Sequence, residues 1–453
     1  MLEGIDISLV ILLVFSVLLV LSFEFINGFH DTANAVATVI YTKSLKPQAA
    51  VILSGTLNFA GVFFGGIGVA IGIINLLPTD ALLQDDVWLG TAMILALLLA
   101  AIIWNFGTWY LGIPSSSSHT LIGSILGIGI AYSGIDGVNW SKAGEVALSL
   151  IMAPIIGMGL AFVLMFLLKV SLKNKQLFEA PDGETPPPMW VRAILVLTCS
   201  GVSFSHGSND GQKGVGLLML VLIGILPMHF ALNPDKSQQD YRAAFQDFDE
   251  KIQIIAQKYP SSTFESITEE RKTLKSLLAK NKLEKVEIKT VRKSIIKLEK
   301  KFKAIYKKEP TLEKEAKTAL RSFKEQTTDY APYWVLIAIA ASLGLGTMVG
   351  WKRIVVTIGE KIGKQHLTYA QGASAELVAT ATIGFSSFVY SLPVSTTHIL
   401  SSGVAGTMIA SNGLKNLQKS TIRNIALAWV LTLPVSIGLA MILFYVLKFL
   451  LVA

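Results

Sequence analysis

The chain has 453 residues, of which 52% are hydrophobic and only 15% are charged. Soluble domains carry charge on about a quarter of their residues, so this composition excludes an ordinary soluble enzyme. The formal net charge is +8, but 23 basic and 16 acidic residues lie within residues 233–330, and the rest of the chain is almost neutral. Because no basic stripe marks a globular domain, we expect no nucleic-acid partner. The single cysteine excludes a disulfide framework.

Apolar runs recur along the chain outside residues 233–330. A helix needs about 20 apolar residues to cross a bilayer. The runs therefore predict an all-α, polytopic membrane protein in contact with a lipid bilayer. In chain order, the expected spans are residues 8–41, 49–77, 87–111, 120–132, 144–168, 190–226, 332–350, 368–392, 399–411 and 422–450.

Two of these runs contain polar interruptions that carry glycine. Residues 27–31 read Asn-Gly-Phe-His-Asp, and residues 206–211 read His-Gly-Ser-Asn-Asp-Gly. Backbone that leaves helical geometry inside a bilayer must be covered by protein or face water, because unpaired N–H and C=O groups are costly in lipid. We therefore expect two broken helices whose interruptions line a binding cavity.

The sequence also repeats itself. A shift of 179 residues aligns the two interruptions, with Asp31 on Asp210, and a shift of 279 residues aligns residues 114–119 with residues 393–398. The difference between the shifts is close to the length of the charged segment. One five-span unit therefore occurs twice, and the charged segment is inserted into its second copy. The domains that follow are residues 1–177 (first repeat), 187–232 with 331–453 (second repeat), and 233–330 (insert).

Five spans per copy place the second copy upside down in the membrane, as in many secondary transporters. Basic short loops, such as those at Lys43 and Lys46 and at residues 415–423, should be cytoplasmic. This threading places both termini and the 233–330 insert outside. Apolar residues recur at helical spacing in the insert, for example at Phe245 and Phe248, and we expect a soluble helical domain.

Asp31 and Asp210 are carboxylates within apolar segments, where charge is costly unless it faces a polar cavity. Asn34 and Lys213 follow them by one helical turn on the same face. Oxygen ligands of this kind suit a small hard cation such as Na⁺, bound transiently at Asp31 and Asp210, and a carboxylate can alternatively take up a proton. Helix capping is the structural alternative. The residues assigned to cation or proton coupling are Asp31, Asn34, Asn209, Asp210 and Glu376.

Two Ser/Thr runs, residues 115–118 and 395–397, each follow a proline and precede a predicted helix. A helix start offers N–H donors and partial positive charge, and the hydroxyls add further donors. Two such starts can hold a tetrahedral oxyanion, whereas one alone is weak support because Ser and Thr commonly cap helices. The residues assigned to the anion are Ser116, Ser117, Ser118, Ser395, Thr396, Thr397, Gln212 and Lys213.

Further ionisable residues lie near these motifs. Glu376 is a second cation ligand or proton relay in this interpretation, whereas Glu24 is structural. The histidine spacing does not suggest a fixed metal site. We interpret four histidines as hydrogen-bonded residues that orient helix starts and do not titrate during transport: His30, His119, His206 and His398.

These motifs together resemble those of a known protein family. Residues 28–38 (Gly-Phe-His-Asp-Thr-Ala-Asn-Ala-Val-Ala-Thr), residues 205–214 (Ser-His-Gly-Ser-Asn-Asp-Gly-Gln-Lys-Gly) and the two Pro-Ser/Thr-His segments resemble the PiT family of inorganic phosphate transporters, especially bacterial low-affinity permeases. The resemblance covers all but the insert. It implies phosphate uptake by alternating access, driven by a cation gradient, through a homodimeric carrier of the bacterial inner membrane.

The resemblance also assigns residues. It implies essential roles for Asp31 and Asp210, phosphate-binding hydroxyls at Ser117 and Thr396 with their neighbours, and the second-repeat glutamate at Glu376. Sodium-coupled members of the family carry a glutamate where this chain has Asn58.

The two interruptions also bear on the identity of the coupling ion. Proton-coupled bacterial members resemble both interruptions more closely, and they are thought to carry phosphate with a proton, partly as a complex with a divalent metal. We favour protons; Glu376 supports sodium coupling as the alternative. No resident cofactor is expected.

Two other classes of protein are alternatives to a symporter. An intramembrane hydrolase is disfavoured because Ser118 and His119 are adjacent and point apart on a helix, and because the chain lacks a Gly-x-Ser-x-Gly elbow. An anion channel would conduct only down the anion gradient, whereas a coupled carrier accumulates its substrate when a cation gradient alone is imposed. The sequence therefore predicts a transporter that is not an enzyme.

Overall fold

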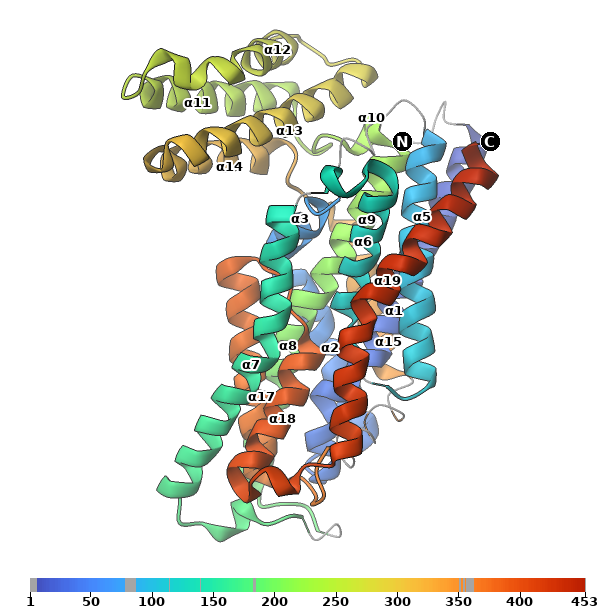
Figure 1. The fold of residues 1–453 in the computed structure, drawn as a ribbon, viewed down its shortest axis with the longest axis vertical. Coiled ribbons are helices and arrows are strands. Elements are labelled where there is room, and N and C mark those ends of the chain that lie inside the picture. The colour runs from blue at the N-terminus through green and yellow to red at the C-terminus, as the bar shows by residue number, and fades with distance from the viewer. Residues whose placement is uncertain are drawn as a thin grey trace. The chain divides into compact units, whose positions relative to one another are not determined.

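A computed structural model gives the structure of the chain, and it describes residues 6–77, 87–113, 115–138, 140–181, 185–349, 352, 355 and 362–452. These residues are mainly helical, with one isolated β-bridge between Gly363 and Leu417 (Figure 1). They divide into two compact units, one of residues 1–78, 92–218 and 333–453 and one of residues 79–91 and 219–332, as far as these are described. The predicted all-α class is confirmed.

Six helical segments within the described residues are long and apolar enough to cross a membrane. Large apolar side chains such as Phe15, Val170 and Phe449 are exposed on their surfaces, which suits contact with lipid tails. The segments are Ile7–Tyr41 (α1), Pro47–Phe64 (α2), Val87–Tyr110 (α5), Ala143–Ser171 within α7 (Trp140–Ser171), Met189–Ile225 and Lys419–Val452 (α19). The shorter apolar helices include Gly68–Ile74 (α3), Ser117–Ser133 (α6), Tyr333–Met348 (α15), Tyr369–Phe385 (α17) and Thr396–Asn412 (α18).

The two expected helix breaks are not observed, and this prediction was wrong. α1 runs without interruption from Ile7 to Tyr41. Helix α8 (Met189–His206) passes through a π-helical turn, Gly207–Gly211, directly into α9 (Gln212–Ile225). A single π-helical turn inserts into a helix without ending it, and such turns are frequent at functional sites.

Close packing between helices explains the glycines in the two interruptions. A Cβ atom on Gly28 would lie 2.4 Å from the Leu343 carbonyl oxygen of α15, and one on Gly207 would lie 2.2 Å from the Asn58 carbonyl oxygen of α2. Glycine inside a helix costs only about 1 kcal/mol relative to alanine, and here it lets two backbones approach. The sequence signal that was interpreted as a break therefore marks a helix crossing.

The element order after each Ser/Thr run is the same. α6 begins at Ser117 and α18 at Thr396; each ends at a glycine with positive φ, 71° at Gly134 and 72° at Gly413. A short 3₁₀ helix and a long helix follow in both cases, α7 after α6 and α19 after α18.

Helices of the first series pack against helices of the second series. α6 packs on α19, whereas α18 packs on α7, and α1 packs on α15 while α2 packs on α8. Each helix start that carries a Ser/Thr run is consequently held by elements distant in the sequence.

The second unit contains a helical domain with its own apolar core. Its helices are Pro227–Phe230 (α10), Gln238–Ala256 (α11), Thr268–Leu278 (α12), Lys285–Lys308 (α13) and Glu313–Thr327 (α14). Phe248, Phe302 and Phe323 are completely or almost completely buried in this core, so the helices predicted from residue spacing are confirmed.

An ion-pair network joins α13 to α14 in this domain. Glu299 accepts from Lys324 at 2.8 Å and from Lys303 at 2.9 Å. Burial by itself raises the pKa of the Glu299 carboxyl, but the charges of Lys324 and Lys303 outweigh this and lower the pKa to about 2. The domain therefore gains stability from this carboxylate only while it is ionised.

Candidate functional site

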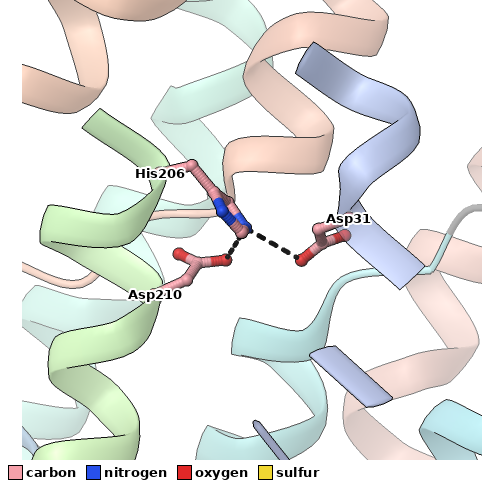
Figure 2. Close-up of side chains that lie close together, drawn as sticks. All are labelled: Asp31, His206 and Asp210. Carbon is pink, nitrogen blue, oxygen red and sulfur yellow. Dashed lines mark ion pairs between the residues drawn. The ribbon is translucent and has the colours of Figure 1, made fainter. Parts of the chain in front are cut away.

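Three buried ionisable side chains meet in the first unit (Figure 2). Asp31 lies on α1, His206 at the end of α8 and Asp210 in the π-helical turn, and each is at most 3% exposed. One ligand atom from each residue lies within 4.8 Å of the others. The two aspartates that align in the sequence repeat thus share one site.

The His206 imidazole lies between the two carboxylates. Its Nε2 atom is 3.2 Å from Asp210 Oδ2 and 3.7 Å from Asp31 Oδ2. The other ring nitrogen, Nδ1, is 2.9 Å from the side-chain oxygen of Asn58 on α2. Both ring nitrogens therefore face oxygen atoms.

A hydrogen-bond network assigns the orientation of the Asn58 amide. The Thr347 hydroxyl donates to the Leu343 carbonyl at 2.9 Å, so its oxygen can accept from the Asn58 amide nitrogen, also at 2.9 Å. The oxygen of the Asn58 amide then faces His206, and His206 Nδ1 must carry the hydrogen of that bond.

This tautomer determines what the cluster can hold. In a neutral ring protonated at Nδ1, the Nε2 lone pair faces carboxylate oxygens, which is repulsive if both Asp31 and Asp210 are ionised. One proton, either on Nε2 or on one of the carboxylates, replaces this repulsion by attraction at 3.2 Å from Asp210 and 3.7 Å from Asp31. The geometry is thus suited to a proton shared by His206, Asp31 and Asp210.

The Ser/Thr runs form helix starts next to this cluster. Ser116 caps α6, its hydroxyl oxygen accepting from the His119 N–H at 3.2 Å, and Ser395 caps α18 by accepting from the His398 N–H at 3.2 Å. The His119 and His398 rings lie 4.5 Å apart between centroids. The two helix starts therefore approach one another, and each cap is supplied by the serine that directly precedes its helix.

The next hydroxyls of both starts donate to the aspartates. Asp31 accepts from Ser117 at 3.0 Å and from Thr397 at 2.6 Å, while Asp210 accepts from Thr396 at 3.0 Å. Asp31 therefore bridges the two helix starts, because Ser117 belongs to α6 and Thr397 to α18. All of these hydroxyl groups are buried.

Lys213 completes the polar cluster from α9. Its Nζ atom lies 2.5 Å from Asp210 Oδ1, 2.5 Å from the Ser118 hydroxyl and 2.9 Å from the Val394 carbonyl oxygen. Ser118 in turn donates to the same carbonyl at 2.8 Å. The lysine is 3% exposed, and its charge is balanced by Asp210 within the protein.

Residues 27–440 match the profile of the phosphate transporter family. The chain belongs to this family. It is 40% identical to the low-affinity inorganic phosphate transporter PitB of Escherichia coli strain K12, over 96% of this chain and 97% of that protein. It is 30% identical to a probable low-affinity inorganic phosphate transporter of Bacillus subtilis, over 97% of this chain and 98% of that protein.

A solved structure is similar in fold. The sodium-dependent phosphate transporter aligns with a TM-score of 0.63 and 19% identity, covering 97% of this chain and all of that one. Members of the phosphate transporter family are transporters, so the predicted membership and the prediction that the chain is not an enzyme are confirmed.

Two residues that were assigned to the site from the sequence, Gln212 and Asn209, bond to groups other than the Ser/Thr hydroxyls of the two helix starts. The Gln212 amide nitrogen donates to the Val62 carbonyl oxygen of α2 at 2.7 Å. The Asn209 side chain donates to the Leu392 carbonyl at 3.1 Å and accepts from the Val394 N–H at 3.1 Å. Asn209 thus fixes the segment that leads into α18.

Glu376 is buried on α17 and accepts from the Thr198 hydroxyl of α8 at 2.5 Å. Glu24 is buried on α1, where one carboxylate oxygen accepts from Asn27 at 3.4 Å. The side chain of Asn34 lies outside the described residues. Glu376 is therefore joined to α8, on which His206 also lies.

The sequence interpretation missed the position of His206. The relevant signal was its spacing, because His206 precedes Asp210 by four residues and helical residues so spaced lie on one face. The family resemblance had singled out Asn58, but nothing in the sequence indicated its contact with His206, which depends on the packing of α2 against α8.

Proposed function

We propose that this member of the phosphate transporter family imports inorganic phosphate across the cytoplasmic membrane as a cation-coupled symporter, with a proton as the coupling ion. The observation that carries the proposal is the buried cluster in which two carboxylates share one imidazole and accept hydrogen bonds from both Ser/Thr helix starts.

The hydrogen-bond donors of the site and the names of the similar proteins both indicate the substrate. Two helix starts and the hydroxyls of Ser117, Thr396 and Thr397 can donate to several oxygens of one tetrahedral anion. Relatives that cover nearly the whole chain are named as inorganic phosphate transporters. Phosphate would sit between the two starts, with its donors drawn from both copies of the repeat.

Competition for these donors would couple phosphate to the cation. In the structure, Ser117 and Thr397 donate to Asp31, so an ionised Asp31 withholds them from phosphate. An anion about 4 Å from a carboxylate is also repelled by about 4 kcal/mol at an effective dielectric constant of 20. A cation that neutralises the cluster removes the repulsion and weakens the carboxylates as acceptors, which releases the hydroxyls to phosphate.

The orientation of His206 favours a proton over sodium. With Nδ1 donating to Asn58, the unfavourable contact between Nε2 and the carboxylates is relieved by one proton. Sodium remains the alternative, since the oxygens of Asp31 and Asp210 are ligands suited to a hard cation, and Glu376 would be a second ligand. Phosphate in complex with a divalent metal is a further form of the substrate.

Alternating access would use the repeated architecture. The repeated series of helices and their exchanged partners support two inverted repeats, residues 1–177 and residues 187–232 with 331–453, with the 233–330 insert in the second. In the structure the site side chains are almost completely buried, as expected of an occluded state. We further propose that the carrier is a homodimer with both termini and the insert outside.

Uptake by reconstituted protein tests the proposal. Purified protein is reconstituted in liposomes that hold radiolabelled phosphate at the same concentration inside and outside, and an inward proton gradient or an inward sodium gradient is imposed separately. We expect accumulation above equilibrium under the proton gradient alone. Accumulation only under the sodium gradient would identify sodium as the coupling ion. Equilibration without accumulation under either gradient would identify a channel or facilitator.

The Asn58→Leu variant is the matched control for the coupling ion. It removes the amide oxygen that accepts from His206 Nδ1 and leaves both aspartates and all the hydroxyls in place. We expect proton-driven accumulation to fall while exchange of internal for external phosphate continues. An unchanged dependence on the proton gradient would show that His206 does not hold the coupling proton.

A further inference from the structure

The three contacts of Lys213 have the composition of a cation site. The ammonium group has three hydrogens, and its three partners are a carboxylate oxygen of Asp210, the hydroxyl of Ser118 and the carbonyl oxygen of Val394. Val394 lies in the non-helical segment before α18. Carboxylate, hydroxyl and non-helical carbonyl oxygens are the groups that bind Na⁺ in transporters, and here one ammonium uses all three.

The first copy of the repeat has a neutral residue at this place. The shift of 179 residues that aligns Asp31 with Asp210 also aligns Asn34 with Lys213. Only the second copy therefore carries a fixed positive charge one turn after its aspartate. The two halves of the site are equivalent in chain position and differ in charge.

We propose that the Lys213 ammonium permanently occupies a cation site of this carrier, formed by Asp210, Ser118 and Val394, so that this half of the site needs no transported cation. The inference rests on the proposed function. Two carboxylates, Asp31 and Asp210, would require two positive charges to become neutral. Lys213 supplies one of them, and a single coupling ion then completes the neutralisation before phosphate enters.

The Lys213→Asn variant tests this directly, because it gives the second copy the residue of the first and leaves room for an ion. Sodium chloride is compared with choline chloride at equal ionic strength in two assays: thermal stability of the purified protein, and proton-driven phosphate uptake in liposomes. We expect the wild type to be indifferent to sodium in both. We expect Lys213→Asn to be stabilised by sodium, and its affinity for phosphate in the uptake assay to rise roughly 5- to 150-fold when sodium is added.

Lys213→Met is the control, since its uncharged chain of similar length fills the space without opening an ion site. We expect it to be inactive and unresponsive to sodium. The proposal is overturned if Lys213→Asn shows neither sodium effect, if it accumulates phosphate fully without sodium, or if wild type and variant respond alike. If Lys213→Asn is not recovered in choline but is recovered in sodium, the proposal is supported.

A variant recovered in neither salt is replaced by Lys213→Ala in the same assays, and failure of that protein to fold in sodium also counts against the proposal. The stability assay does not depend on transport. A wild type that accumulates phosphate, together with a variant that ignores sodium, rejects this inference alone, whereas a wild type that fails to accumulate phosphate rejects the proposed function.

Discussion

Asp31→Asn should separate phosphate binding from coupling. The substitution keeps the size of the side chain but removes the charge that attracts the hydroxyls of Ser117 and Thr397, at 3.0 Å and 2.6 Å. A hydrogen bond to a charged group contributes about 1 kcal/mol more than one between neutral groups. Releasing both donors from an ionised acceptor therefore favours phosphate binding by about 2 kcal/mol, or roughly 30-fold in the dissociation constant.

The assay compares equilibrium binding with accumulation. Phosphate binding to purified protein is measured at equilibrium, and uptake is measured in liposomes under a proton gradient. We expect Asp31→Asn to bind phosphate at least as tightly as the wild type and to exchange it, but not to accumulate it. Normal accumulation would mean that Asp31 has only a structural role, and complete loss of binding would mean that it holds the substrate directly.

Three further predictions concern single residues. Ser117→Ala removes one phosphate donor and should raise KM for phosphate roughly 10-fold, as expected for one hydrogen bond to an anion, with kcat and thermal stability little changed. Gly28→Ala places a Cβ against the α15 backbone and should destabilise the purified protein by about 1–3 kcal/mol in thermal unfolding, whereas Gly107→Ala, with no atom within 4 Å of the new Cβ, should not. The pKa of Glu299 is lowered to about 2 from an ordinary 4.5, so the insert should lose up to about 3 kcal/mol of stability as the pH falls from 4.5 towards 2. Pepsin digestion of the full-length protein should therefore accelerate over that range. Glu299→Gln should remove this pH dependence.

The sequence predicted the helices and the pairing of the two aspartates better than it predicted backbone geometry. Hydropathy located the six segments that are long and apolar enough to cross a bilayer among the described residues, because the length of an apolar run is tied to the thickness of the bilayer. The expected span 49–77 is divided in the structure into α2 and α3. Internal repetition picked out Asp31 and Asp210 as equivalent residues, and the structure brings them together. The expected breaks failed because glycine is compatible both with a broken helix and with close helix packing, and only the partner backbone distinguishes them, as Gly28 and Gly207 show.

Side-chain partners from distant elements could not be predicted. The assignment of the His206 tautomer depends on Asn58 of α2 and, beyond it, on Thr347 of α15. These three residues belong to separate helices that meet only in the folded protein, and no spacing in the sequence records their contact. Lys213 was likewise assigned to phosphate from its neighbours in the chain, whereas its bonds are to Asp210 and to residues before and within other helices.

A shared proton in the carboxylate–imidazole cluster can be tested by counting the protons taken up when phosphate binds. Calorimetric titration of the purified protein with phosphate, repeated in buffers of different ionisation enthalpy, gives this number. A His206→Gln variant, which keeps both aspartates and every hydroxyl, provides the reference for protons carried by phosphate itself. If the carboxylate–imidazole cluster holds the coupling proton, the wild type takes up more protons per phosphate than the variant; equal proton uptake by the two proteins would contradict the account.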